Sequence, residues 1–315
     1  MRLAVFVLAL LAAAPAAAQS RWALIVSGAS GGEKYASDMA EWRAGLQSAL
    51  VDRYGFETDH VRVLVDERAE GDRGTAANVR ARLGELAKAM EREDLLLVVL
   101  FGHGTYDGEV AKFNLVGPDL TAADWAGLLD ALRGQVVVVN TTESSFPFLE
   151  RLSASGRVVI TATDSAAQKY ATVFPEYFVQ AMREASSDLD KNGRTSIFEV
   201  ISAASQSVRQ HYEQAGQLTT ERAVFDDNGD GVGREPQAPG PDGAVARQVY
   251  LEAENPAAAG NPELAALLRR RRELETEAEQ LKLQKDGMPA DAWAAEFERL
   301  MVELARVSKE IREKS

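Results

Sequence analysis

The stretch DLLLVVLFGHGTYDG, at residues 94–108, decides the fold. Its apolar run at 95–101 is too short for a typical helix, and it does not alternate with polar residues, which is typical of a strand buried on both faces. Similar runs occur at WALIV (22–26), VRVLV (61–65), VVVVN (136–140) and RVVITAT (157–163). These runs predict the strands of one buried sheet.

Amphipathic segments between these runs predict helices at 38–55, where Gly55 ends the segment, at 75–90, and at 121–132, which opens with a threonine cap. Alternating strands and helices predict an α/β fold, a mostly parallel sheet with helices on both faces. In such sheets ligands bind beyond the carboxyl ends of the strands. His103 and Thr142 each follow a predicted strand, so we expect both to face one crevice.

Composition and the first residues limit the function classes. A formal charge of −13 argues against a nucleic-acid partner, because phosphate binding needs clustered cations. The absence of cysteine excludes disulfides and thiol chemistry. Residues 1–18 carry Arg2, an apolar run and an Ala-x-Ala site, which predict a secretory signal peptide. We expect a secreted or periplasmic protein without a membrane span after signal cleavage.

Three further regions follow the signal peptide. Residues 19–185 form the predicted α/β domain, and the acidic region 186–254 completes it. Residues 255–315 predict a linker and a coiled-coil hairpin, broken by KDGMPAD at 285–291. Its apolar seams are Leu267, Leu274, Leu281, Trp293, Phe297, Leu300, Leu304, Val307 and Ile311. The hairpin either stabilises the protein or mediates self-association or docking through 262–315. The RRRR at 269–272 is either a solvated face or a contact for anionic lipid or another partner.

Two acidic stretches resemble calcium-binding loops. DLDKNGRTSIFE, at 188–199, fits the twelve-residue pattern, with Gly193 at the sharp turn. Its predicted ligands are Asp188, Asp190, Asn192, the Arg194 carbonyl, Ser196 and Glu199. DDNGDGVG, at 226–233, repeats the opening with Asp226, Asn228 and Asp230 but lacks the final glutamate. We predict calcium as a cofactor; the alternative is a capping network at the start of a helix.

Four motifs resemble the legumain branch (peptidase C13) of the caspase–haemoglobinase superfamily, over roughly residues 21–183: WALIVSGASGG, VLFGHGTYDG, VVVVNTTESSF and VVITATDSA. The resemblance implies a three-layer fold with His103 as general base and the Gly104 N–H as oxyanion donor. Laying the family's EACESGSMF on NTTESSFPF puts Thr142 at the cysteine position. The substrate-binding positions would then be Asn140, Glu143, Ser144 and Asp164.

The missing cysteine determines the functional expectation. A thiol beside an imidazole ionises near neutral pH, whereas a hydroxyl must lose its proton to a well-placed base during attack. The family's charged specificity clamp is also replaced, by Ala36, Ser37 and Asn140. We therefore expect a non-catalytic homologue that binds a peptide or protein partner. The alternatives are an active hydrolase that uses Thr142 or a neighbouring serine with His103 as base, and a calcium-stabilised structural scaffold.

Overall fold

The computed structural model describes residues 19–66, 70–189, 191, 193–253 and 261–314. The predicted signal peptide lies outside these residues, as do Asp190 and Asn192 of the first acidic loop. None of the described helices is both long enough and apolar enough to cross a bilayer.

The central sheet has six strands in the order β2-β1-β3-β7-β8-β9. Five of them run parallel: β1 (Arg21–Ser27), β2 (Val61–Leu64), β3 (Leu95–Phe101), β7 (Gln135–Asn140) and β8 (Arg157–Thr161). The sixth, β9 (Val224–Asp226), pairs antiparallel with β8 and comes from the acidic region. The predicted α/β fold with a mostly parallel sheet is confirmed.

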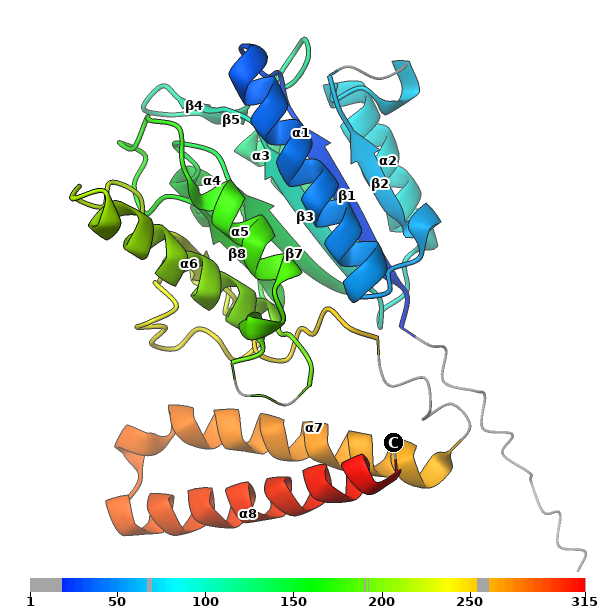
Figure 1. Cartoon of the computed structure of the whole chain (residues 1–315), viewed down its shortest axis with the longest axis vertical. Helices are drawn as coiled ribbons and strands as arrows, with labels where there is room; N and C mark the ends of the chain where they lie inside the picture. The colour runs from blue at the N-terminus through cyan, green and yellow to red at the C-terminus, as the bar shows by residue number, and fades with distance from the viewer. Residues whose placement is uncertain (1–18, 67–69, 190, 192, 254–260, 315) are drawn as a thin grey trace, which may run out of the picture.

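Helices cover both faces of this sheet (Figure 1). One face carries α1 (Glu33–Ser48), α5 (Phe174–Arg183) and α6 (Ile197–Gln214), and the other carries α2 (Ala76–Ala89), α3 (Ala122–Leu129) and α4 (Phe146–Leu152). Strand β3 is buried along its whole length, and its side chains enter the two cores alternately. Burial on both faces explains why its sequence is apolar without alternation.

The helix boundaries follow the capping signals. The Thr75 hydroxyl accepts from the Asn78 N–H at the start of α2, and Thr121 forms a capping box with Asp124 at the start of α3. The hydroxyl of Thr121 lowers the pKa of Asp124 to about 2. Helix α1 begins five residues before the predicted start and passes into a π-helical turn, η1 (Ala49–Arg53), after which Gly55 has φ 66°.

A second, small antiparallel sheet was not predicted. It consists of β4 (Gly104–Tyr106), β5 (Ala111–Phe113) and β6 (Leu120–Thr121), and it begins directly after His103. Short 3₁₀ segments occupy η2 (Thr58–His60), η3 (Glu70–Asp72) and η4 (Ala185–Ser187). The small sheet packs Phe113 edge-on against Trp125 of α3, which holds the segment after His103 in place.

The two ends of the α/β body meet. The Arg21 guanidinium, at the start of β1, donates to the Tyr54 carbonyl at 2.5 Å and to the Leu251 carbonyl at 2.6 Å. Burial lowers the pKa of this arginine. Residues as far along the chain as 251 therefore belong to the same packed body as β1.

The C-terminal segment forms the predicted helical hairpin, with α7 (Pro262–Leu283) and α8 (Ala290–Lys314) joined through η6 (Lys285–Gly287). Figure 1 shows the two helices side by side, with α7 nearer the body. Every predicted seam residue lies in or against the core that the helices share. The Lys314 ammonium, 2.9 Å from Glu263, ties the open end together.

Candidate functional site

The candidate site lies at the carboxyl edge of β3 and β7, which are neighbours in the sheet. His103 and Gly104 follow β3, and Thr142 and Glu143 follow β7. The two segments touch: a Cβ added to Gly104 would lie 2.5 Å from Thr142 Oγ1 and 2.4 Å from the Glu143 carbonyl oxygen. The structure thus brings together the loops that carry the predicted base and the predicted nucleophile.

The His103 ring lies between two hydrogen-bond acceptors. Its Nδ1 is 3.0 Å from Glu143 Oε1, and its Nε2 is 3.1 Å from the Ser30 carbonyl oxygen. The ring also meets Tyr35 edge-on, with centroids 4.8 Å apart. A carbonyl oxygen can only accept, so Nε2 faces Ser30 as a donor, and Nδ1 also carries hydrogen when it faces an ionised carboxylate. This geometry fits an imidazolium paired with Glu143, and a protonated ring has no lone pair with which to take another proton.

We predict that the pKa of His103 lies above its ordinary value of 6.5, because the Glu143 carboxylate stabilises the charged ring. The Glu143→Gln variant should lower this pKa. Because the pKa of His103 is higher in the folded than in the unfolded state, the His103–Glu143 pair stabilises the fold fully below about pH 6.5. This stabilisation is lost as pH rises through the folded-state pKa. An NMR titration of the ring measures the pKa, and denaturation at several pH values measures the stability.

A His103 pKa at or below 6.5, unchanged in Glu143→Gln, would show that the ion pair does not form in solution.

The Thr142 hydroxyl is bonded away from His103. Its Oγ1 donates to Asn140 Oδ1 at 2.8 Å, with the Glu143 carbonyl oxygen at 3.1 Å, and the side chain is buried. The Thr142 backbone N–H also donates to Asn140 Oδ1, at 3.1 Å. Asn140 therefore holds Thr142 from both its backbone and its side chain, as expected for a turn hydroxyl.

The neighbouring serines have similar partners. Ser144 Oγ donates to the Gln168 carbonyl oxygen at 3.1 Å, and Ser145 Oγ lies 3.1 Å from Thr163 Oγ1. Ser144 has φ 50°, a strained value for a residue other than glycine, and its N–H donates to the same Gln168 oxygen at 2.8 Å. Among the described residues, none of the hydroxyls of Thr142, Ser144 and Ser145 is hydrogen-bonded to His103.

The segment after β8 covers the Thr142 loop. In addition to the Gln168 contact, Thr172 Oγ1 donates to the Thr141 carbonyl oxygen at 2.6 Å. Asp164 begins this segment and lies 3.8 Å from Arg222 at the surface. Ala36 and Ser37, at the positions of the family's charged clamp, lie in the first turns of α1. The sequence did not single out Ser30, Tyr35 or Gln168, because a backbone carbonyl or a lone aromatic side chain at the start of a helix has no motif.

In the first acidic loop, the described side chains cap the helix that follows. Glu199 Oε2 accepts from the Ser196 N–H and hydroxyl, each at 2.8 Å, and Oε1 accepts from the Leu189 N–H at 2.9 Å. Asp188 Oδ2 accepts from the Gly193 N–H at 2.9 Å, and the Arg194 guanidinium lies over the Tyr250 ring. These contacts match the capping-network alternative, and the calcium site stays a prediction.

We expect that, if this loop binds calcium, added calcium raises the melting temperature and a chelator lowers it, because a ligand bound only by the folded state stabilises it. The Asp188→Ala variant should lose most of this response. Thermal unfolding followed by circular dichroism measures it, with magnesium as the ion control. An unchanged melting temperature in the wild-type protein would end the calcium prediction.

In the second acidic loop the carboxylates face backbone N–H groups and an arginine. Asp226 accepts from the N–H groups of Asn228, Gly229 and Gly231 at 2.6–3.0 Å. Asp230 pairs with the Arg234 guanidinium at 2.9 Å, which lowers the pKa of Asp230 to about 2. A group of three Asp, Glu or His side chains could hold a metal ion if their ligand atoms lay close together. Within the described residues, such atoms all lie within 4.8 Å of one another only at Glu57, Asp59 and His60, before β2. Calcium at the second loop also stays a prediction.

The sequence similarity of this chain to known proteins is local. No family model matches the sequence. Metacaspase-4, metacaspase-7 and metacaspase-6 of Arabidopsis thaliana match over 60 residues, at 35%, 38% and 33% identity. The match spans 19% of this chain and only 14–16% of the length of those relatives. Protein GSU0716 from Geobacter sulfurreducens superposes with a TM-score of 0.48 at 15% identity, over 75% of this chain and 100% of that one. The local matches point to the caspase-like superfamily.

Proposed function

We propose that this chain is an exported, legumain-like homologue of the caspase-like peptidases that has no peptidase activity. Its crevice beside His103 binds a peptide or protein partner. The observation that carries this proposal is the His103 ring, which lies between Glu143 and the Ser30 carbonyl while the Thr142 hydroxyl is bonded to Asn140.

A hydroxyl nucleophile needs a neutral base within hydrogen-bond reach, because its own pKa is far above neutrality. His103 Nε2 lies 3.1 Å from the Ser30 carbonyl oxygen, and among the described residues no hydroxyl that follows β7 is hydrogen-bonded to the ring. Thr142 is 1% exposed, so a scissile carbonyl could not approach its oxygen without moving the loop. The chain contains no cysteine that could take its place. These features support loss of the hydrolytic step.

Exposed apolar side chains surround the same edge of the sheet. Tyr35 follows β1, Val110 lies between β4 and β5, and Tyr170 follows β8 with 78% of its surface exposed. Tyrosine is enriched in protein interfaces, since it buries a large apolar area and also offers a hydroxyl. The exposed tyrosines support a role for this edge in binding a partner.

A displayed peptide library and a fluorogenic peptide library, each with and without calcium, test the proposal. We expect bound peptides but no turnover above the level of His103→Ala. Tyr170→Ala should lower the affinity for the selected peptides by about tenfold or more, because truncation of an interface tyrosine commonly has an effect of this size. Val302→Ala, at an exposed position on α8, is the control and should leave binding unchanged.

Turnover that His103→Ala abolishes would overturn the proposal in favour of a hydrolase that uses Thr142 or a neighbouring serine. Selection of no peptide, together with calcium-dependent melting, would favour the structural scaffold.

A further inference from the structure

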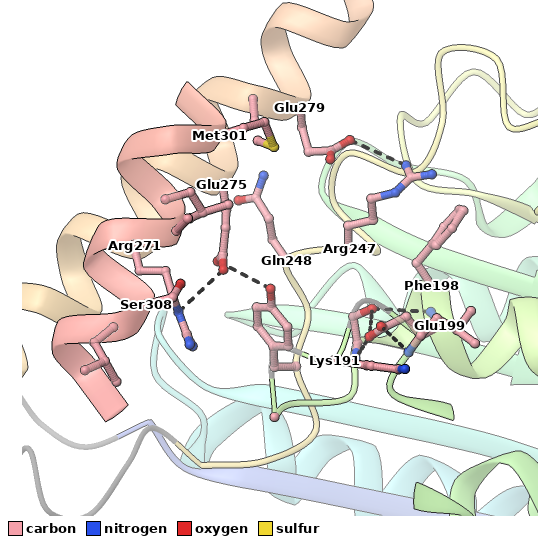
Figure 2. A pocket seen from close by; sticks show the side chains of 18 of the residues that line it. Lys191, Phe198, Glu199, Arg247, Gln248, Arg271, Glu275, Glu279, Met301 and Ser308 are labelled. Atoms are coloured by element: carbon pink, nitrogen blue, oxygen red, sulfur yellow. Dashed lines mark hydrogen bonds and ion pairs between the residues drawn. The ribbon is translucent and has the colours of Figure 1, made fainter. Parts of the chain in front are cut away.

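A cavity of about 840 Å³ lies between the helical hairpin and the α/β body (Figure 2). On the body it is lined by residues of the first acidic loop and of the segment 247–250, and on the hairpin by residues of α7 and α8. This volume is within the range that holds drug-sized ligands, which often bind where two structural units meet. None of the residues that line this cavity belongs to the candidate site around His103 and Thr142.

The RRRR segment contributes to this cavity. Arg269 is exposed and Arg270 pairs with Glu303 at 2.8 Å, but Arg271 is only 7% exposed and lines the cavity. The expectation of a solvated face is therefore wrong for Arg271. The Glu275 carboxylate lies 3.5 Å from its Nε, which has no hydrogen-bond partner in the described part of the chain. A buried guanidinium with an unsatisfied donor favours an additional acceptor.

The carboxylates of the cavity wall are already engaged. Glu279 lies 2.6 Å from Lys282 and 3.7 Å from Arg247, which also stacks on Phe198. Glu275 accepts from the Tyr250 hydroxyl at 3.4 Å. The third carboxylate, Glu199, caps α6.

Cations of the wall are in excess over these carboxylates. Arg312 lines the cavity one helical turn from Ser308, and no ion pair involves it among the described residues. Together with Arg271 and the other cations, it makes five cationic side chains on the wall against three carboxylates. An anion is therefore the ligand charge that this wall fits, although the whole chain carries a formal charge of −13.

The rest of the wall is apolar. Met301, Leu304 and Ile311 of α8 face the cavity together with Ala278 of α7. Leu189, on the body side, is 53% exposed and lines the cavity opposite them. Burial of such surface against a hydrocarbon chain is favourable.

We propose that this cavity binds a single amphipathic anion, an alkyl or acyl chain with a carboxylate or phosphate head. The head lies at Arg271 and Arg312, because a guanidinium can hold either group through two parallel hydrogen bonds. The chain lies along Met301 and Leu304. Walls on both sides favour one free molecule over a lipid that remains in a bilayer.

Equilibrium binding of dansyl-labelled undecanoate to the full-length protein tests this proposal. Dodecanoate and dodecyl phosphate, used below their micelle-forming concentrations, should displace the probe, whereas dodecanol should compete at least about tenfold more weakly because it lacks the charge. Arg271→Met should weaken the binding affinity for the probe by about tenfold or more. The matched control, Arg269→Met, changes an exposed arginine of the same segment and should have no effect.

Two further variants keep the test valid if Arg271→Met fails to fold. Ser308→Asp should weaken binding of the probe, because the new carboxylate repels its charged head. Met301→Trp should weaken binding by filling the part of the cavity that holds the hydrocarbon chain. A separate arm measures co-sedimentation with phosphatidylglycerol vesicles. Absence of probe binding, equal effects of the two arginine variants, or binding to vesicles alone would overturn the proposal.

Discussion

Replacement of Asp227 by asparagine is expected to lower the free energy of unfolding by about 3 kcal/mol. Asp227 is 1% exposed. Its Oδ1 accepts from the Gly243 N–H, and its Oδ2 accepts from the N–H groups of Val245 and Ala246, all at 2.8–2.9 Å. An asparagine keeps only one acceptor oxygen, and its NH₂ group would face an N–H donor in a site without water access. Urea denaturation measures the change.

The control is Asp230→Asn in the same loop. Asp230 is 38% exposed and pairs with Arg234 near the surface, so its loss should cost less than about 1 kcal/mol. Equal effects of the two variants would show that the buried contacts of Asp227 contribute little to stability.

Substitution of Gly104 by alanine should destabilise the fold by about 2 kcal/mol or more, because the added methyl group overlaps neighbouring atoms. The Cβ would lie 2.4 Å from the Glu143 carbonyl oxygen and 2.5 Å from Thr142 Oγ1. Relief of this overlap requires movement of the 142–143 backbone, which would also shift the partner of His103. Thermal unfolding and the NMR signal of the His103 ring measure the two effects.

Gly84→Ala is the matched control. Gly84 is an exposed residue inside α2, and an added Cβ there meets no atom within 4 Å. Alanine should stabilise this helix by up to about 1 kcal/mol. A Gly104→Ala protein as stable as Gly84→Ala would mean that the two loops are farther apart in solution.

The main elements of the fold could be predicted because local and tertiary requirements agree. Strand β3 spans the predicted 95–101, and α3 begins after its predicted cap, Thr121. The strands that were missed, β4, β5, β6 and β9, have two or three residues each. Segments of that length show no periodicity, and only their partners hold them in the sheet. Likewise, nothing in RRRR distinguishes the buried Arg271 from the exposed Arg269 until the hairpin meets the body.

The candidate site was predictable in position but not in hydrogen bonding. The carboxyl ends of neighbouring parallel strands must meet, so His103 and the Thr142 loop could be placed together from the sequence. The partners of His103 could not, because they depend on the direction of the Glu143 side chain and on a carbonyl in the loop after β1. Asp227 was missed for the same reason, since its partners are N–H groups at residues 243–246.

The contact between Arg21 and the Leu251 carbonyl has a consequence for biosynthesis. The Arg21 side chain cannot make this contact until the segment that contains β9 and Leu251 has been translated, although β1 can pair with β2 and β3 earlier. Contacts between such distant residues make folding slow, whereas α7 and α8 share a core of their own. Nascent chains that stop before residue 251 should thus leave the start of β1 more accessible to proteases than it is in the folded body.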